Sequence, residues 1–383
     1  MQKISTEEIL KANSVQKINL KGVPIKNKRD LSVFYTPGVA EVCKQIVKNP
    51  EDVYKYTSKQ NLVAIVTDGT RILGLGKIGP FAGMPVMEGK AVLFKKFADI
   101  TAIPICLATK NKDEIIKTIK AIAPSFGAIN LEDIESPKCL EIEKKLSETL
   151  YIPLFHDDQW GTAIITLAGL INALKVVKKD KNVKICINGC GAAGVGITKL
   201  LLDYGFKTIV VADSSGVIYD GMPNLNPFKQ EIAERTNQNK EKGNTIKTAL
   251  VGADVFIGVS GVANSITSND VKKMNKNAIV FALTNPQADI SFEDVKTCEN
   301  VAIYASGRSD LPNQINNVVV FPGFMKFLLK NRIKTITPEM RILASETIAK
   351  YIKNPRKNKI VPSAFSDVAK QLTEMKITIT NNN

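Results

Sequence analysis

Short apolar runs and longer amphipathic stretches alternate along most of this chain. From about residue 61 onward, runs rich in β-branched and apolar residues recur, and the stretches between them have helical spacing. The runs predict strands over Leu62–Thr67, Ala102–Ala108, Phe126–Leu131, Tyr151–Phe155, Val183–Asn188, Thr208–Ala212, Val255–Val259, Ala278–Leu283 and Val301–Ala305. Helices are predicted over Asp113–Ile122, Lys138–Leu150 and Thr162–Val177. This alternation favours an α/β fold with parallel sheets covered by helices.

The length of the chain favours two domains. Its 383 residues exceed the roughly 250–300 residues at which a single hydrophobic core stops growing. We expect an α/β domain over residues 1–160, a second over 161–330, and a helical C-terminal segment over 331–383 that packs back on the body. The stretch Thr162–Val177 is apolar on most faces and is predicted to be a buried helix. Pro338–Tyr351 is the clearest helix of the final segment.

Composition excludes several classes of protein. Apolar residues make up 44% of the chain and charged residues 23%, which excludes a disordered or collagen-like chain. No uninterrupted apolar run reaches the roughly 18 residues that a membrane helix needs, and the N-terminus lacks the apolar core of a signal peptide. We therefore expect a cytoplasmic protein with no membrane partner.

The net charge of +15 would suit nucleic acid, an anionic surface or small anionic substrates. Because no dense basic stripe with interleaved aromatic residues occurs, we interpret the charge as compositional bias and expect no nucleic-acid partner. The six cysteines form no CxxC pair, and the single histidine, His156, cannot complete a zinc set with them. Reduced thiols are expected.

The strongest local motif is Gly189-Cys190-Gly191-Ala192-Ala193-Gly194, which follows a predicted strand and opens a predicted helix. In this context the glycines permit a tight turn, and a pyrophosphate can sit on the helix N-terminus. Asp213 ends the next strand, where a carboxylate can hold the ribose hydroxyls of NAD and repel the 2′-phosphate of NADP. Lys207, just before that strand, would soften the preference. The motif predicts a Rossmann-type site for NAD, with NADP as the less favoured cofactor, rather than an ordinary glycine-rich turn.

Two acidic pairs follow neighbouring predicted strands. Glu132 and Asp133 come directly after one strand, and Asp157 and Asp158 come shortly after the next. Because the carboxyl ends of parallel strands lie at one edge of a sheet, we expect these carboxylates to converge and to need a cation. Mg²⁺ or Mn²⁺ with oxygen ligands fits that requirement. The alternative is that these acids are N-cap and first-turn residues of the following helices.

Two upstream segments that read as loop-rich carry a candidate acid and a candidate base. They are Tyr35-Thr36-Pro37-Gly38-Val39 and Pro85-Val86-Met87-Glu88-Gly89-Lys90. Burial beside a metal would lower the pKa of Lys90 toward neutrality and suit it to act as a general base. By spacing alone, both Tyr35 and Lys90 would more often be surface or packing residues.

Spaced segments between about residues 30 and 350 together resemble the malic enzymes, in particular the short bacterial type. They are Tyr35–Val39, Thr67–Gly76, Asn130–Asp133, Phe155–Thr162, Asn188–Gly194, Thr284–Pro286 and Asn316–Gly323. The resemblance implies an N-terminal α/β substrate and metal domain followed by a Rossmann-type NAD-binding domain. It also implies oxidative decarboxylation of L-malate to pyruvate and CO₂ with a nicotinamide cofactor and a divalent metal, and a homodimer.

The same resemblance implies roles for individual residues. Lys90 matches the base that takes the C2 hydroxyl proton, Asp157 the acid that pairs with it, and Tyr35 the acid that protonates the enol at C3. The remaining matches are the metal ligands Glu132, Asp133 and Asp158, the malate-carboxylate arginine Arg71, and the amides Asn285 and Asn317 (or its neighbour Asn316), which hold substrate and nicotinamide.

Two positions depart from the usual bacterial pattern. Trp160 stands where histidine is frequent, which affects the shape of the pocket rather than catalysis. Cys190 stands where alanine is usual and adds a thiol near the pyrophosphate that can be oxidised.

Two other functions stay open. A malolactic enzyme would convert malate to lactate and retain the reduced cofactor, although the larger size of its members argues against it. A Rossmann domain can also bind a nucleotide without turnover, since a fold does not fix a function.

Overall fold

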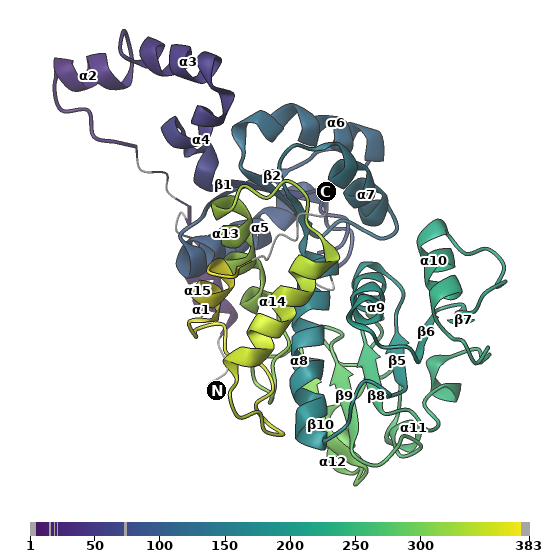
Figure 1. Ribbon diagram of the computed structural model, residues 1–383. Helices are drawn as coiled ribbons and strands as arrows, with labels where there is room; N and C mark the ends of the chain where they lie inside the picture. Colours follow the sequence, from purple (N-terminus) through teal and green to yellow (C-terminus); the bar gives the residue numbers. More distant parts are fainter. Residues whose placement is uncertain (1–4, 15–16, 19, 21, 73–74, 377–383) are drawn as a thin grey trace.

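The computed structural model describes residues 5–14, 17–18, 20, 22–72 and 75–376 and contains two sheets covered by helices (Figure 1). The first sheet has the strand order β2-β1-β3-β4, and the second has the order β10-β9-β8-β5-β6-β7. Neighbouring strands are parallel except for the β6-β7 pair. The predicted α/β fold with parallel sheets is confirmed.

The predicted strands are all found, with small shifts at their ends. In the first sheet they are β1 Leu62–Thr67, β2 Thr101–Cys106, β3 Ala128–Leu131 and β4 Leu154–His156. In the second they are β5 Ile185–Asn188, β6 Ile209–Asp213, β7 Gly216–Val217, β8 Val255–Gly258, β9 Ala278–Ala282 and β10 Val301–Ser306. The strand β7 was not predicted, because so short a segment has no detectable alternation.

Helices precede and cover the first sheet. They are α1 Thr6–Asn13, α2 Lys28–Phe34, α3 Val39–Lys48, α4 Val53–Tyr56, α5 Gly79–Ala98, α6 Lys112–Ile122 and α7 Lys138–Thr149, with 3₁₀ turns at Pro50–Asp52, Ser58–Asn61 and Ala123–Ser125. The described residues of α1 to α4 include none that is buried. In Figure 1, α2 and α3 project away from the body.

The prediction of a loop-rich segment at Pro85–Lys90 is wrong, because this segment lies inside the long helix α5. The buried residues Gly83, Met87, Lys90, Ala91 and Phe94 follow helical spacing along one face of α5. Proline and the glycines of this stretch, which disfavour helices, hid that spacing in the sequence. Lys90 therefore sits on the inward face of a helix.

Helices of the second half cover the second sheet and return to the first. They are α8 Thr162–Val177, α9 Ala192–Tyr204, α10 Pro227–Arg235, α11 Ser268–Val271, α12 Phe292–Lys296, α13 Phe321–Lys330, α14 Pro338–Tyr351 and α15 Val368–Thr373, with 3₁₀ turns at Ile246–Thr248 and Asn317–Val319. The helix α8 has the predicted bounds and is largely buried. The stretch Asp157–Val177 is long and apolar enough to cross a membrane, but 72% of its most apolar window is buried inside the fold, as in a core helix.

The C-terminal helices pack against both halves of the chain. The helix α13 contacts α5 and α15, and α14 lies across α8 and also contacts α9 (Figure 1). The rings of Phe94 and Phe321 are 4.7 Å apart, and those of Phe155 and Phe324 are 5.4 Å apart. One hydrophobic core therefore continues from the first sheet to the second, and it brings the carboxyl edge of the first sheet close to the glycine turn after β5.

Candidate active site

Lys90 lies at the centre of the candidate site. Its side chain is 7% exposed, and its ammonium forms ion pairs with Asp157 and, over 2.5 Å, with Glu132 Oε2. Burial lowers the pKa of Lys90, but the charges of Asp157 and Glu132 outweigh burial and raise it above its ordinary value. The predicted fall of this pKa is therefore not found in this arrangement, because the sequence did not reveal that two carboxylates flank the ammonium.

The two acidic pairs meet at the carboxyl edge of the first sheet, as predicted. The strands β3 and β4 are parallel neighbours, so the residues that follow them lie side by side. Asp158 Oδ2 accepts a hydrogen bond from the backbone N–H of Asp133 over 2.9 Å. Burial raises the pKa of Asp157 to about 6, and it also raises the pKa of Glu132.

A π-helical turn, Asp157–Gly161, carries the second acidic pair into α8. Asp157 is fully buried, and its Oδ2 binds Lys90 and accepts a hydrogen bond from Asn317 Nδ2 over 2.5 Å. A Cβ at Gly161 would lie 1.9 Å from Asp157 Oδ1, so only glycine fits there. Because Asp157 Oδ2 binds other side chains, the alternative of an N-cap acid does not account for Asp157.

The donor set fits a hard divalent cation. The carboxylates of Glu132 and Asp157 flank the Lys90 ammonium, and Asp158 lies close enough to act on its charge. Asp133 follows Glu132 and binds Asp158 through its backbone N–H, so the carboxylates outnumber the ammonium. Asp157 Oδ1 is buried and has no hydrogen-bond partner among the described residues. In the described part of the chain, no three His, Cys, Asp or Glu side chains already surround a common point. Glu132 is turned toward Lys90, so a cation that took Glu132, Asp133 and Asp158 as ligands would require Glu132 to rotate.

The glycine turn after β5 has the shape that a dinucleotide needs. Gly189 has a φ of +117°, and a Cβ there would lie 2.7 Å from the backbone nitrogen of Ser260. A Cβ at Gly194 would lie 1.8 Å from the carbonyl oxygen of Gly189. Neither position accepts a side chain.

The N-terminus of α9 is accessible at its N-cap residue, Gly191, which is the second glycine of the turn. A Cβ at Gly191 would have Ser136 Cβ, at 4.0 Å, as its nearest neighbour among the described residues. No described side chain caps α9, so the first N–H groups of the helix, which begins with Ala192 and Ala193, are available to a pyrophosphate. Since Ser136 follows the acidic edge of the first sheet, a cofactor bound here would lie beside the carboxylates.

Asp213 ends β6, as predicted for the residue that holds the adenosine ribose. Its Oδ1 accepts a hydrogen bond from the Ser215 N–H over 2.7 Å, and its Oδ2 binds the ammonium of Lys229 on α10. Lys207 lies before β6, at the opposite end of the strand. The cation that faces Asp213 is therefore Lys229, and the structure does not place Lys207 at the end of β6 where it was expected to moderate the cofactor preference.

The Cys190 thiol lies inside the glycine turn but is 4% exposed. Burial raises the pKa of Cys190 to about 12. A neutral, shielded thiol is a poor target for oxidation, contrary to the expectation from the sequence.

The predicted substrate residues come from both halves of the chain. Arg71 follows β1, and its backbone N–H donates to the Asp133 carbonyl over 3.0 Å. Its guanidinium lies beside Gly261, where a Cβ would be 2.9 Å from Nη2.

The predicted amide residues lie in the second half of the chain. Asn285, after β9, packs against Gly307. Asn317 reaches Asp157, whereas Asn316 Oδ1 accepts a hydrogen bond from the Val318 N–H. Asn317 is therefore the member of this pair that joins the cluster.

Tyr35 is not brought to this cluster within the chain. It directly follows α2 on the projecting arm of α2 and α3 (Figure 1), and it is 66% exposed. No local pattern in the sequence indicates that Tyr35 and Lys90 lie on separate parts of the molecule.

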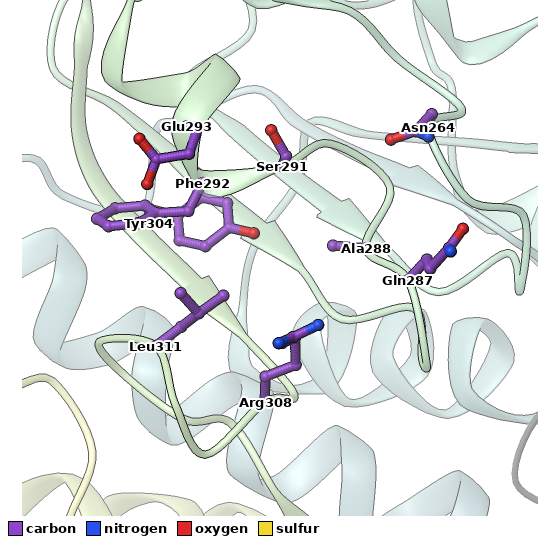
Figure 2. Close-up of a pocket in the computed structure, with 9 residues that line it drawn as sticks. All are labelled: Asn264, Gln287, Ala288, Ser291, Phe292, Glu293, Tyr304, Arg308 and Leu311. Carbon is purple, nitrogen blue, oxygen red and sulfur yellow. The ribbon is translucent and has the colours of Figure 1, made fainter. Parts of the chain in front are cut away.

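A separate cavity of about 390 Å³ lies beside β10 and α12 (Figure 2). Phe292 and Tyr304 form its apolar wall, and Arg308 and Glu293 bring opposite charges to it. None of the predicted site residues lines this cavity. We therefore place the candidate active site at Lys90 and the carboxylates.

Sequence reasoning missed several residues that hold the site in place. Asp68 is fully buried, and its carboxylate binds Lys138 over 2.5 Å and the Thr70 hydroxyl over 2.6 Å. The Thr70 hydroxyl in turn accepts a hydrogen bond from the Glu135 N–H over 2.9 Å. This network holds the loop after β3 that carries Glu132 and Asp133. In the sequence, Asp68 stands out only as part of the run Thr67–Arg71, and nothing there indicates that Lys138 is its partner.

A Rossmann-type domain with an open glycine turn, next to a buried lysine and a group of carboxylates, defines a nicotinamide-dependent oxidoreductase. Comparison with known families makes this specific. Residues 14–114 and 109–147 match the family described as malic enzyme, N-terminal domain, and residues 160–381 match malic enzyme, NAD binding domain. The chain belongs to the malic enzyme family, and it is an NAD- or NADP-dependent enzyme of the oxidoreductase class.

Individual relatives agree with this family. The chain is 50% identical to a NAD-dependent malic enzyme of Geobacillus stearothermophilus over 90% of this chain and 72% of that protein. It is 47% identical to a bifunctional malic/malolactic enzyme of Bacillus subtilis over 96% of this chain and 93% of that protein. The crystal structure of a NAD-dependent malic enzyme of Thermotoga maritima superposes with a TM-score of 0.92 at 44% identity, over 97% of this chain and 98% of that one. Relatives named NADP-dependent malic enzymes are also matched.

Proposed function

We propose that this protein oxidises L-malate with a nicotinamide cofactor and releases pyruvate and CO₂, with Mg²⁺ or Mn²⁺ as its metal. The observation that carries the proposal is the buried ion pair between Lys90 and Asp157, which lies among carboxylates at the sheet edge nearest the glycine turn. A base, an acidic ligand set and a dinucleotide turn are the parts that this reaction requires.

In the proposed reaction, the Lys90 ammonium first passes a proton to Asp157, with which it is in direct contact and whose pKa burial raises to about 6. The neutral amine of Lys90 then accepts the proton of the malate C2 hydroxyl, and the nicotinamide cofactor would take up the hydride from C2. The ketone then loses its C4 carboxylate as CO₂. Tyr35 donates a proton to C3 of the resulting enol, which gives pyruvate.

Glu132, Asp133 and Asp158 are the proposed metal ligands. When bound, the divalent cation supplies positive charge that polarises the C2 oxygen and stabilises the enolate formed when CO₂ leaves. Asn317 holds Asp157 in place, so Asp157 remains paired with Lys90 when Glu132 turns away. Arg71, Asn285 and Asn317 are the proposed contacts to the substrate and the nicotinamide.

For the cofactor we propose that NAD is preferred and that NADP is accepted. Asp213 disfavours a 2′-phosphate by its charge, but the ammonium of Lys229 neutralises part of that charge at the same place. With 26% of its side chain exposed, Lys229 can also reach a phosphate in the cofactor groove. The balance between these two residues sets the preference.

We propose that the active unit is a homodimer in which Tyr35 of one subunit completes the site of the other. None of the described residues of α2 and α3 is buried, and the apolar side chains of Val33, Phe34 and Val47 are all at least half exposed. An arm with so much exposed apolar surface is expected to pack on another chain. Such an arm would carry Tyr35 away from its own Lys90.

We further propose that the enzyme acts in the cytoplasm on the small molecule malate, with neither nucleic acid nor a membrane as partner. The basic residues are dispersed along the chain, and the apolar stretch Asp157–Val177 is accounted for by the core.

Malolactic conversion is the second candidate function. The length argument against it does not hold, because the bifunctional malic/malolactic relative is matched over 93% of its own length. Both reactions use the same base, metal ligands and cofactor groove, and they differ in whether pyruvate and the reduced cofactor leave the site or react further to lactate.

The test is an assay of L-malate with each cofactor and with Mg²⁺ or Mn²⁺, in which reduced nicotinamide, pyruvate and lactate are all measured. We expect reduced nicotinamide and pyruvate in equal amounts, and no turnover after chelation. Lactate without free reduced nicotinamide would support the second candidate. The absence of any product with either cofactor would contradict both.

A further inference from the structure

Trp160 is the only tryptophan of the chain and lies two residues after Asp158, in the turn Asp157–Gly161. Its side chain is 6% exposed, and its Nε1–H donates a hydrogen bond to Glu143 Oε1 of α7 over 3.1 Å. The turn that carries two of the site carboxylates is thereby tied to a helix of the first half of the chain.

Arg341 covers the other side of the indole ring. Its guanidinium carbon lies 3.5 Å from the centre of the Trp160 ring, and the residue is 9% exposed. Its Nε is buried without a hydrogen-bond partner among the described residues. Arg341 also sits in the first turn of α14, at the positive end of the helix dipole, where a cation is disfavoured. A charge placed in such an unfavourable position requires compensating interactions, which the nearby carboxylates and the planar stack on Trp160 provide.

The same turn is held from a second direction by Gln159. Gln159 Oε1 lies 3.1 Å from Nδ1 of the buried His156. A Cβ at Gly196 on α9 would lie 2.5 Å from the Gln159 carbonyl oxygen, so helix and turn are in close contact. Within one turn, Gln159 and Trp160 contact the surrounding helices, whereas Asp157 and Asp158 face Lys90 and the loop of Asp133.

We propose that Arg341 and Trp160 are positioning residues that hold the turn of Asp158 in the geometry a divalent cation requires, so that α14 sets the cation affinity of the site. This inference rests on the proposed function, because it takes Asp158 as a metal ligand. Residues that orient metal ligands typically contribute 10–100-fold in metal affinity.

Arg341 is a poor candidate for an anion-binding site of its own. The carboxylates of Glu143, Asp203 and Glu339 lie close enough to raise its pKa against the effect of burial, which lowers it to about 10. An anion at Arg341 would be repelled by these acids. The stack on Trp160 is the contact that connects Arg341 to the site.

The experiment measures Mn²⁺ binding to the metal-free protein by electron paramagnetic resonance of the free ion. Arg341→Met should weaken Mn²⁺ binding about 10–100-fold. Arg341→Lys, which keeps the charge but not the planar stack, should weaken it similarly. Arg332→Met is the matched control, because the Arg332 guanidinium stacks on Tyr54 at 3.9 Å, on a ring outside the candidate site; it should bind Mn²⁺ as the wild type does.

Variants of Trp160 give a second, independent comparison. Trp160→Phe keeps a ring beneath Arg341 and should bind Mn²⁺ more tightly than Trp160→Leu. In proteins that retain Trp160, its fluorescence should change on addition of Mg²⁺, and this change should be lost in Asp158→Asn. Thermal unfolding of each variant shows whether it is folded.

The outcomes separate the inference from the proposed function. If Arg341→Met and the wild type bind Mn²⁺ equally, including the case in which only the melting temperature falls, Arg341 has a packing role and the inference is overturned. If the wild type itself binds no Mn²⁺, the proposed metal site is wrong and the inference fails with it. Loss of affinity in Arg341→Met but not in Arg332→Met supports it.

Discussion

Lys90 and Asp157 form an ion pair that is almost entirely shielded from water, although 67 positions separate them in the chain. Lys90 comes from the inward face of α5, and Asp157 comes from the turn after β4. Removing one member of a buried pair leaves the other charge without a partner, which is costly. The pair therefore both fixes α5 against the first sheet and places a potential base beside the carboxylates.

Replacing Lys90 by methionine tests its role as the base. Lys90→Met keeps most of the side-chain volume, and we expect kcat/KM for malate to fall by ~10²–10⁴-fold, as is typical of a lost general base. Lys96→Met, on the exposed side of the same helix, is the control and should keep the wild-type rate. Folded Lys90→Met protein with unchanged kcat/KM would rule out Lys90 as the base.

Replacing Asp158 should weaken metal binding and leave cofactor binding unchanged. We expect Asp158→Asn to weaken Mn²⁺ binding by at least about 10-fold, since a neutral amide replaces a charged ligand. Binding of NAD, measured by calorimetry, should persist because the glycine turn belongs to a different segment. Asp180→Asn, at an exposed loop, serves as the control. Normal activity of Asp158→Asn at limiting metal would contradict the ligand set.

The pair of Asp213 and Lys229 should set the cofactor preference. In Lys229→Met the carboxylate of Asp213 loses its partner and repels a 2′-phosphate fully, so kcat/KM with NADP should fall about 10-fold, equivalent to ~1.4 kcal/mol. The value with NAD should change less. Lys207→Met, at the other end of β6, should alter neither. An unchanged ratio of NAD to NADP in Lys229→Met would show that Lys229 does not face the ribose.

Tyr35 should act across the dimer. Tyr35→Phe and Lys90→Met are each expected to be inactive in pyruvate formation, but a mixed dimer contains one site with both native residues if Tyr35 acts in trans. Activity should therefore return when the two variants are co-expressed with different tags and the mixed dimer is purified. If the mixed dimer is as inactive as its parents, Tyr35 acts within its own chain or is not the acid.

The helices and strands with a regular hydrophobic periodicity could be predicted from the sequence. The strands of both sheets and the helix Thr162–Val177 have strong local patterns, and parallel neighbours at a sheet edge brought Glu132 and Asp158 together as expected. By contrast, α5 was not predicted, because its proline and glycines disfavour a helix in the local sequence. Its helical spacing is apparent only once the residues that pack against the core are known.

The remaining features depend on contacts that no local pattern records. Lys229 meets Asp213 from a later helix, and Arg341 meets Trp160 across 181 positions of the chain. The direction of the Lys90 pKa in this arrangement depends in the same way on which carboxylates reach the ammonium. The placement of Tyr35 depends on where the arm leaves the body.

The most direct test of the central claim is the fate of the C4 carboxylate of malate. With L-malate labelled at C4, metal and NAD, the account predicts labelled CO₂, pyruvate and reduced nicotinamide in equal amounts, and none of the three with Lys90→Met. Reduced nicotinamide formed without labelled CO₂ would mean that the enzyme only oxidises malate, and it would contradict oxidative decarboxylation at this site.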